Sequence, residues 1–470
     1  MSSDLRKKKL GDVVALVVDN RGRNPKSYAE NGIPVIDNYL ITGDGTVKLS
    51  EVKRFIDDET YESFLREYIQ EDDVLMTLVG NGYGKVAITP KEMCAIIQNT
   101  IGLRCNKNND NQYLYYLLFD NREALMNLNR GAAQPSIKVG DVLDLEFQFP
   151  SLKEQRRVAG ILRSIDSVIE LNRQTSQTLE QMAQAIFKSW FVDFEPVKAK
   201  IAALEAGGSE DDALLAAMQA IAGSALFATD AADADAQTQL ARLQAEHPEQ
   251  YTTLRATAEL FPSAMQESEL GEIPEGWDVG TLADFSDLNK NSWTAKTIPE
   301  EIDYVDLANT KNGVIESTTK YLSGDAPSRA RRKLFNGDTI IGTVRPGNRS
   351  FAFIRQPSSS LTGSTGFAVL SPKSPEFAEY IYIAATSDEA INHLAHLADG
   401  GAYPAVRSEV VVGITVVVPG SPVLMFFHEM VRSYFDISAS LKVESKSLSE
   451  LRDTLLPKLL SGELSVAEAE

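Results

Sequence analysis

Hydrophobic side chains recur at alternating steps of four and three residues in two stretches of the chain, with a few polar side chains among them. Such spacing keeps one face of an α-helix apolar and is the pattern of a coiled-coil seam. The seam positions are Val158, Leu162, Ile165, Ile169, Asn172, Ser176, Leu179, Ala183, Ile186 and Trp190 in the first stretch, and Phe427, Val431, Tyr434, Ser438, Leu441, Ser445, Leu448, Arg452, Leu455 and Leu459 in the second. The pattern predicts two long helices, the first reaching from about Glu154 to Trp190, roughly 55 Å at 1.5 Å per residue.

A shift of 269 residues superposes the two seams, and the same shift superposes segments that precede them. The matched segments are residues 131–137 with 400–406, 35–37 with 304–306, and 149–150 with 418–419. Leu10-Gly-Asp-Val and Leu282-Ala-Asp-Phe correspond at a slightly different shift. The chain is therefore an internal repeat, in which each half is a mixed α/β unit of about 140 residues followed by one long helix.

The repeat predicts an α+β fold with two mixed α/β domains in a pseudo-two-fold repeat, joined by two long antiparallel coiled-coil helices. Ser151 and Glu154 form a capping-box pattern at the start of the first helix. The expected boundaries are a first domain at 1–150, a first spacer helix at 151–195, an acidic Ala-rich insert at 196–270, a second domain at 271–420, a second spacer helix at 421–464, and a C-terminal tail at 465–470.

The net charge of −20 is unevenly distributed along the chain. Residues 201–270 hold twelve acidic and two basic side chains, whereas residues 1–150 hold 18 basic and 22 acidic, and residues 276–419 hold 13 and 16. The two domains are thus close to neutral, and local basic clusters in them remain compatible with nucleic-acid binding. The insert is predicted to be partly helical and accessory.

Metal chemistry and membrane insertion are not indicated. The two cysteines, Cys94 and Cys105, do not make a metal site, and His393 and His396 share a helical face without further ligands. No run of eighteen apolar residues occurs. We expect a cytoplasmic protein that binds no metal.

Motifs of the obvious enzyme classes are also missing. The segment from Gly80 to Lys85 lacks the spacing of a phosphate-binding loop and is predicted to be a β-hairpin turn with an exposed lysine. Asp37, Glu51 and Lys53 have the outline of a nuclease site, but the repeat places Lys320 at the position of Glu51. No Asn-Pro-Pro-aromatic tetrapeptide is present. We therefore expect no catalytic residues.

Polar loops with Arg, Lys, Asn and Gln are the remaining candidates for chemistry. Arg hydrogen-bonds guanine, and Asn or Gln adenine, in the major groove of DNA, while Lys and Arg neutralise phosphates. Solvated loop charges are ordinary in any soluble protein, so the clusters in the second domain are the more informative ones. The candidate DNA-binding residues are Arg21, Arg23, Asn24, Lys26, Asn81, Tyr83, Lys85, Arg130, Gln134, Arg329, Arg331, Arg332, Lys333, Arg345, Asn348, Arg349, Tyr403 and Arg407.

Four segments give the chain a resemblance, over almost its whole length, to the specificity subunit of type I restriction–modification systems. They are Phe149-Pro-Ser-Leu-Lys-Glu-Gln-Arg, Phe187-Lys-Ser-Trp-Phe-Val-Asp-Phe, Glu269-Leu-Gly-Glu-Ile-Pro-Glu-Gly-Trp and Leu451-Arg-Asp-Thr-Leu-Leu-Pro-Lys-Leu-Leu-Ser-Gly-Glu-Leu. One departure is the segment after Pro422, where Val-Leu-Met-Phe replaces the expected Glu-Gln.

The resemblance implies a non-catalytic subunit whose two target-recognition domains each read one half of an asymmetric, bipartite DNA site. The helices would fix the gap between the halves and dock two methylation subunits, which methylate adenine with S-adenosylmethionine. Restriction subunits would hydrolyse ATP, with Mg, and cut the DNA. This chain itself would bind no cofactor.

Two alternatives remain open at this point. A stand-alone DNA-binding or decoy protein of the same build would bind DNA without methylation subunits. A coiled-coil scaffold with protein-binding ends would show no salt-dependent DNA affinity.

Overall fold

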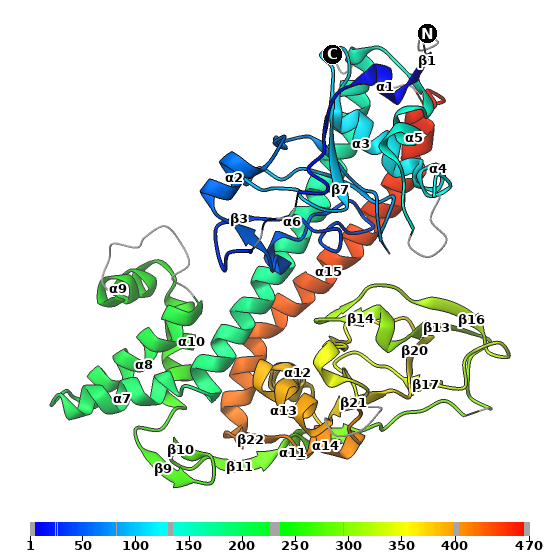
Figure 1. The fold of residues 1–470 in the computed structure, drawn as a ribbon. Helices are drawn as coiled ribbons and strands as arrows, with labels where there is room; N and C mark the ends of the chain where they lie inside the picture. Colours follow the sequence, from blue (N-terminus) through cyan, green and yellow to red (C-terminus); the bar gives the residue numbers. More distant parts are fainter. Residues whose placement is uncertain are drawn as a thin grey trace. The chain divides into compact units, whose positions relative to one another are not determined.

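The computed structural model describes residues 5–23, 25, 27–80, 82–129, 135–225, 236–294, 296–398 and 404–464. The chain divides into two compact units (Figure 1). Unit 1 comprises Met1–Leu171 and Glu444–Glu470, and unit 2 comprises Asn172–Val443. Each unit contains one mixed α/β domain and a part of both long helices.

The domain of unit 1 is built on a four-stranded antiparallel sheet with the strand order β2-β7-β5-β6. Strands β1 and β8 form a separate antiparallel pair that joins the start of the domain to its end. The elements are β1 (Arg6–Lys9), α1 (Leu10–Val13), β2 (Val14–Val18), β3 (Ile33–Pro34), β4 (Phe55–Ile56), α2 (Asp58–Phe64), β5 (Val74–Thr77), β6 (Val86–Ile88), β7 (Thr100–Cys105), α3 (Asn111–Asp120), α4 (Arg122–Met126), α5 (Val139–Leu143) and β8 (Glu146–Phe149).

The core of this domain follows directly from its apolar runs. All four residues of β5 are buried, and α3 buries six consecutive residues, from Tyr113 to Leu118, in a core that the sheet shares with α6 and α15. The helix starts where it does because the Asp110 side chain accepts a hydrogen bond from the Tyr113 backbone N–H at 3.0 Å, an N-cap contact.

The domain of unit 2 repeats this arrangement and adds to it. Its sheet β12-β21-β18-β19 has the order of β2-β7-β5-β6, and β11 pairs with β22 as β1 pairs with β8. A second sheet, β16-β13-β20-β17, has no counterpart of its size among the described residues of unit 1. The elements are β11 (Asp278–Thr281), α11 (Leu282–Phe285), β12 (Ser286–Leu288), β13 (Glu301–Val305), β14 (Thr310–Lys311), β15 (Val314–Ile315), β16 (Thr319–Leu322), β17 (Ala330–Lys333), β18 (Thr339–Gly342), β19 (Phe351–Phe353), β20 (Leu361–Ser364), β21 (Phe367–Pro372), α12 (Ala378–Thr386), α13 (Asp388–Ala398), α14 (Ser408–Val412) and β22 (Thr415–Val418).

The matching strand orders confirm the repeat that the sequence predicts. The shift of 269 residues is kept from α5 to α14 and from β8 to β22. It becomes 272 at α1 and α11, as the sequence indicates, and 267 between β7 and β21.

The two predicted long helices are α6 (Leu152–Phe191) and α15 (Ser421–Leu460), each of 40 residues. All twenty predicted seam positions are buried or half-buried. In unit 1, Asp166 of α6 contacts Arg452 of α15, and in unit 2, Glu180 of α6 contacts Lys442 of α15. Higher numbers in one helix thus meet lower numbers in the other, so the helices are antiparallel. The expected cap is present, because the Glu154 backbone N–H donates to Ser151 Oγ at 3.3 Å.

The acidic insert forms helices that pack on the end of α6 in unit 2 (Figure 1). Trp190 of α6 contacts Phe261 at a ring-centroid distance of 5.2 Å, edge to face. The elements are α7 (Glu195–Glu205), α8 (Glu210–Ala225), α9 (Ala236–Glu246), α10 (Pro248–Glu259), β9 (Met265–Ser268) and β10 (Gly271–Pro274). None of the helices that the structure describes combines the length and apolar character needed to cross a membrane.

Candidate nucleic-acid interface

Arg21 and Arg23 of unit 1 both lie in the loop after β2, where protein contacts hold them. Arg21 forms a two-pronged ion pair with Asp19, at 2.9 Å from Nε and 2.6 Å from Nη2. The Arg21 side chain lowers the pKa of Asp19 through this hydrogen bond. Arg23 stacks its guanidinium over Phe64 at 5.8 Å and donates to the Phe64 carbonyl at 3.4 Å. These contacts orient the two arginines on the surface of the domain.

The hairpin between β5 and β6 has the predicted form, but its lysine is not exposed. Lys85 is half-buried, and its ammonium donates to the Ile41 carbonyl at 2.9 Å. Burial, and then the nearby Arg122, lower the pKa of Lys85. Tyr83 is half-buried against the core of the domain. The expectation of an exposed lysine is therefore wrong, because the ammonium folds back onto a backbone carbonyl.

Six candidates lie outside the described residues, and the structure gives no account of them. They are Asn24, Lys26, Asn81, Arg130, Gln134 and Tyr403.

In unit 2, the basic cluster from Arg331 to Lys333 lies in strand β17 rather than in a loop. This strand forms one edge of the sheet β16-β13-β20-β17. Arg332 is half-buried, donates to Ser292 Oγ at 3.4 Å, and has its pKa lowered by burial. Arg329, just before the strand, is exposed. The loop interpretation is corrected here: pairing of β17 with β20 fixes the cluster as an edge strand.

Aromatic side chains adjoin this edge strand, a feature that the sequence interpretation missed. The Lys333 ammonium lies 4.6 Å from the ring centre of Trp293 and 5.0 Å from that of Phe335, both within cation–π range. Trp293 is anchored because its indole Nε1 donates to Thr362 Oγ1 at 2.9 Å. A tryptophan in the polar run from Lys290 to Thr294 is the sequence signal that was available.

The Pro-Gly turn of unit 2 places two candidate arginines in strained backbone. Arg345 has φ 48° and Arg349 has φ 59°, both in the left-handed region that is unfavourable for residues other than glycine. Arg345 and Asn348 are exposed. Arg349 is committed to the fold, since it pairs with Asp388 at 2.7 Å and donates to Asn312 at 3.0 Å.

Hydrogen bonds connect this turn to the segment that carries Arg407. Val344 forms an antiparallel bridge with Ala405, and the Arg345 backbone N–H donates to the Pro404 carbonyl at 2.9 Å. Arg407 follows at the start of α14 and is exposed. The structure therefore brings together two loops that are about 60 residues apart in the chain and carry exposed arginines.

Unit 1 contains the same pair of loops. Val79 bridges Ser136, and the Gly80 N–H donates to the Pro135 carbonyl at 3.1 Å. Gly80 has φ 92°, so the position equivalent to Arg345 is also left-handed. One unit thus uses glycine, which adopts this backbone freely, where the other retains an exposed arginine at a cost of about 1 kcal/mol or more. Arg345 is thus an exposed arginine held in left-handed backbone.

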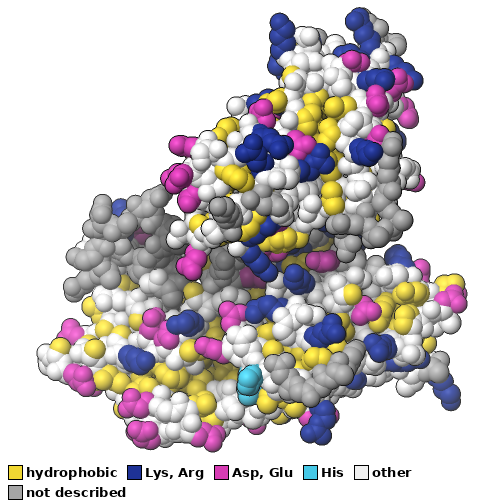
Figure 2. Space-filling view, in the orientation of Figure 1, with side chains coloured by type: hydrophobic (Ala, Val, Ile, Leu, Met, Phe, Trp, Pro, Cys, Tyr) yellow, Lys and Arg dark blue, Asp and Glu magenta, His cyan; other side chains and the backbone are white. Residues whose placement is uncertain are grey.

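Basic side chains on the face drawn in Figure 2 lie in several separate groups, with acidic and hydrophobic side chains between them.

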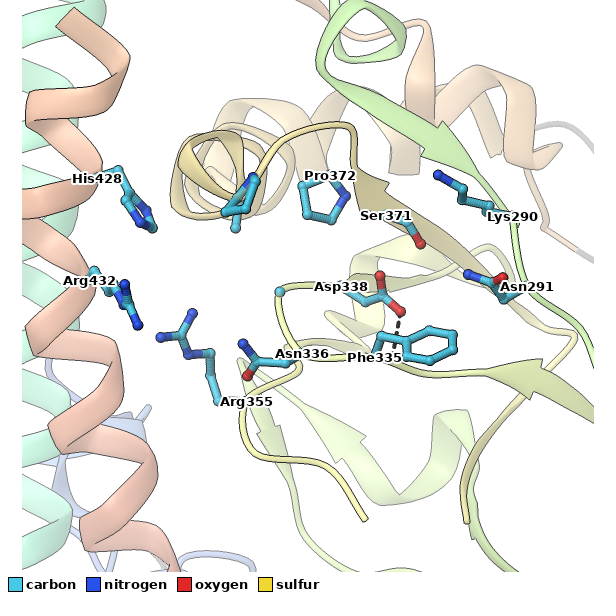
Figure 3. A pocket seen from close by; sticks show the side chains of 13 residues that line it. Lys290, Asn291, Phe335, Asn336, Asp338, Arg355, Ser371, Pro372, His428 and Arg432 are labelled. Carbon is cyan, nitrogen blue, oxygen red and sulfur yellow. Dashed lines mark hydrogen bonds between the residues drawn. The ribbon is translucent and has the colours of Figure 1, made fainter. Parts of the chain in front are cut away.

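A cavity of about 450 Å³ in unit 2 lies between the domain and α15 (Figure 3). His428 and Arg432 line it from the helix, and Asp338 and Ser371 from the domain. Burial raises the pKa of Asp338 to about 6. Its carboxylate accepts the Phe335 backbone N–H at 2.7 Å, which fixes the turn before β18.

The outline of a nuclease site is not assembled. Asp37 accepts a hydrogen bond from Arg54 Nε at 2.7 Å, Glu51 pairs with Lys48 at 3.4 Å, and Lys53 is exposed. Within the described ranges, no group of three His, Cys, Asp or Glu side chains is arranged to hold a metal. Cys94 and Cys105 are free, and burial raises the pKa of each thiol to about 12.

Comparison with known proteins agrees with this architecture. A family model described as the type I restriction modification DNA specificity domain matches residues 2–181. The HindI specificity subunit of Haemophilus influenzae, a type I restriction enzyme subunit, is 28% identical over 417 residues, covering 85% of this chain and 88% of that protein. The MjaIX specificity subunit of Methanocaldococcus jannaschii is 22% identical over 367 residues, covering 76% and 70%.

A solved structure has the same fold. The S subunit of a type I restriction-modification system from M. genitalium superposes with a TM-score of 0.51 at 15% identity, covering 97% of this chain and 96% of that one. Fold and comparisons together define a two-domain, helix-linked DNA-specificity protein. The chain is similar to the specificity subunits of type I restriction–modification systems over most of its length, and residues 2–181 match their DNA specificity domain. The matched residues include the mixed α/β domain of unit 1, and the domain of unit 2 repeats its strand order.

Proposed function

We propose that this chain is the DNA-reading subunit of a type I restriction–modification complex and reads an asymmetric, bipartite site. Each recognition domain reads one half-site. Two methylation subunits then methylate adenine with S-adenosylmethionine, and restriction subunits cut the DNA with ATP and Mg. The chain binds none of these cofactors itself.

The duplicated pair of loops is the observation that supports the proposal most directly. Gly80 bonded to Pro135 in unit 1 repeats as Arg345 bonded to Pro404 in unit 2. The scaffold is the same, whereas the exposed side chains differ. Two different half-sites require two reading surfaces of this kind, because base edges are distinguished by side-chain hydrogen bonds.

The helices supply the second part of the proposal. Each has 40 residues, or about 60 Å at 1.5 Å per residue, and their antiparallel seam makes them stiff. We assign them the role of fixing the gap between half-sites, which on one face of the duplex is set by the helical repeat of about 34 Å. Removal of one heptad from both helices is then expected to shorten the gap.

Methylation mapping is the experiment that tests the function. The chain is expressed with its methylation subunit in a methylation-free host, and modified adenines are read along the whole genome. A single split motif with a fixed gap supports the proposal. An assembled complex that leaves no methylated motif contradicts it and favours the decoy alternative.

A variant sharpens this experiment. Arg345→Ala is expected to relax base preference in one half of the motif and leave the other half unchanged. Loss of preference in both halves would contradict the assignment of one half-site to each domain.

A further inference from the structure

The two recognition domains are attached to their long helices by different chemistry. In unit 1 the attachment is centred on Gln155 in the first turn of α6, whose side chain is fully buried. Its Nε2 donates to the Pro150 carbonyl at 3.0 Å and to Asn109 Oδ1 at 3.2 Å, and its Oε1 accepts the Asp110 N–H at 2.9 Å. A neutral amide thus joins the helix to the start of α3.

Unit 2 lacks this amide. The position equivalent to Gln155 in α15 is Leu424, which is 1% exposed and contributes only apolar contacts. The departure from the family pattern after Pro422 therefore removes three hydrogen bonds from this attachment.

A cluster of ionisable side chains occupies the corresponding region of unit 2. Glu379, in the first turn of α12, is completely buried. Its carboxylate accepts from Arg355 Nη1 at 3.2 Å and lies 2.5 Å from His428 Nδ1 of α15. Arg355 also pairs with Asp436 of α15, and Asp436 with Arg432 at 3.3 Å.

This cluster links three elements that are distant in the chain. Glu379 belongs to α12, Arg355 to the segment after β19, and His428 and Asp436 to α15. Two side chains of the domain therefore contact two successive regions of one face of the helix, which restrains both translation and rotation of the domain on α15. Charge-assisted hydrogen bonds are suited to this, because a hydrogen bond weakens steeply when its geometry is lost.

The cavity of about 450 Å³ lies beside the cluster, with His428, Arg432 and Arg355 in its wall (Figure 3). Apolar packing is thus incomplete on this side of the attachment. The cavity opens to solvent, so on this side the domain is held on α15 by the contacts of Glu379 with His428 and of Arg355 with Asp436 instead of by close apolar packing.

We infer that Arg355, Glu379, His428 and Asp436 are positioning residues that hold the second recognition domain at a fixed angle on its spacer helix, in place of the amide that unit 1 uses. This role rests on the proposed bipartite recognition. The gap at which the second half-site is read depends on the cluster. Reading of the first half-site does not depend on the cluster.

The test uses the complete methylation complex with Glu379→Gln, and Asp436→Asn as a milder variant that leaves the buried carboxylate intact. Glu246→Gln on α9 is the control, since it removes the same charge from an exposed i,i+4 pair with Arg242. Methylation rates are compared on DNA with the native gap and with one base pair more or less. Wild type and Glu246→Gln are expected to prefer the native gap, and Glu379→Gln to lose at least fivefold of that preference.

DNA with mismatches in the first half-site distinguishes a loss of domain positioning from a general loss of folding, because only a folding defect changes how the first half-site is read. Their effect is expected to stay within twofold of wild type in Glu379→Gln and Asp436→Asn. Unchanged gap preference in both folded variants overturns the inference. Equal loss at both half-sites overturns it as well, because the effect is then a general loss of folding.

Hydrogen exchange of the free protein distinguishes failure of this inference from failure of the proposed function. Glu379→Gln is expected to speed exchange at least fivefold in the first turn of α12 and around His428, with α3 of unit 1 unchanged. If exchange becomes faster but the complex methylates no split motif, the role of the cluster in holding the domain on α15 is supported and the proposed bipartite recognition is contradicted. Unchanged exchange at both places overturns the attachment itself.

Discussion

The pairing of α6 with α15 includes a cluster of aromatic rings in unit 2, beside the half-exposed Glu180–Lys442 pair, and an ion pair with the buried Arg452 in unit 1. In unit 2, Trp190 and Phe191 of α6 meet Phe427 of α15 at ring-centroid distances of 5.9 and 5.1 Å. In unit 1, Arg452 of α15 pairs with Asp166 of α6 at 2.8 Å, and Asp166 also accepts the Tyr116 hydroxyl at 2.6 Å. Both contact regions lie along the same heptad pattern. The pattern therefore predicts that the two helices pair, but not whether aromatic or charged side chains make the contact.

The repeat shows what the ion pair adds. The positions equivalent to Asp166 and Arg452 are Phe435 and Ala183, both buried in the core of unit 2. If α6 paired with α6 of a second copy, Asp166 would face Ala183 and lose its cation. A buried charged or polar position in a coiled coil selects one partner and one register in this way. We therefore expect the aromatic cluster of unit 2 to contribute most of the stability of the helix pair, and the Asp166–Arg452 pair of unit 1 to favour pairing of α6 with α15 over pairing with a second α6.

Trp190→Ala tests the aromatic side and is expected to have the largest effect. Trp190 is fully buried among Phe261, Phe191 and Phe427. Its truncation is expected to cost unit 2 about 3–5 kcal/mol of unfolding free energy, as for other large core deletions. Urea unfolding followed by fluorescence measures unit 2 selectively, because all three tryptophans lie in it and Trp277 and Trp293 remain. A loss below 1 kcal/mol would mean that the cluster does not stabilise this unit.

Asp338 extends the comparison to the sheets. It precedes β18 as Asp73 precedes β5, and both carboxylates accept a backbone N–H three residues earlier, at 2.7 and 2.8 Å. Asp73 pairs with Arg104 at 2.7 Å, whereas Asp338 has no ion-pair partner among the described residues. Burial therefore raises the pKa of Asp338 to about 6.

The sign of the resulting pH dependence follows. Between about pH 4 and 6 the unfolded chain releases the Asp338 proton, while the folded chain still holds it. The stability of unit 2 is thus expected to fall as pH rises through this window, by about 3 kcal/mol in total, and then to level off. Asp338→Asn keeps the acceptor for the Phe335 N–H and is expected to remove this fall. Parallel pH profiles for the two proteins, measured by tryptophan fluorescence, would contradict the assignment.

Arg452→Ala tests the ionic side of the helix pair. It leaves Asp166 without its cation in a site where the carboxylate is 28% exposed and still accepts Tyr116. Loss of one partner of a buried pair costs about 3–5 kcal/mol, and the partial exposure reduces our expectation to about 2–3 kcal/mol. Hydrogen exchange in α3 reports it, since this helix packs in the same core.

A double variant distinguishes the effect of the Asp166–Arg452 charge interaction from the effect of the packing around Arg452. Asp166→Leu with Arg452→Met replaces both charges by apolar side chains and is expected to restore stability to within about 1 kcal/mol of wild type. It is also expected to increase self-association, which light scattering measures. A double variant as unstable as Arg452→Ala would mean that Arg452 acts mainly through its own packing.

The sequence predicts periodic features well, because the period itself is the physical cause. The seam from Val158 to Trp190 is apolar at the spacing of a helix face, and that face is buried. The repeat was predictable for the same reason. The capping contact between Ser151 and Glu154 could be predicted because it joins two residues that are only three positions apart.

Candidate contacts were less predictable, because they depend on partners far apart in the sequence. Lys85 reaches the carbonyl of Ile41, and Arg349 reaches Asp388, neither of which a local pattern indicates. The cluster at Glu379 was missed for this reason, since its members come from three elements. The left-handed backbone at Arg345 was equally invisible in a Pro-Gly turn.

Arg345 offers the finest test of how the two units differ, because its counterpart is Gly80. Arg345→Gly removes the side chain and also releases the left-handed strain at φ 48°. Unit 2 is therefore expected to gain about 0.5–1 kcal/mol of stability, as when a strained residue is replaced by glycine. DNA affinity is expected to fall by about 1–3 kcal/mol at one half-site, the range of a lost arginine contact to a base. Arg345→Ala keeps the strain, so it is expected to lose the same affinity without the gain in stability. Equal stability of the two variants would show that the turn is not strained. Unchanged DNA affinity in both would remove Arg345 from the reading surface and leave Arg407 as its nearest candidate.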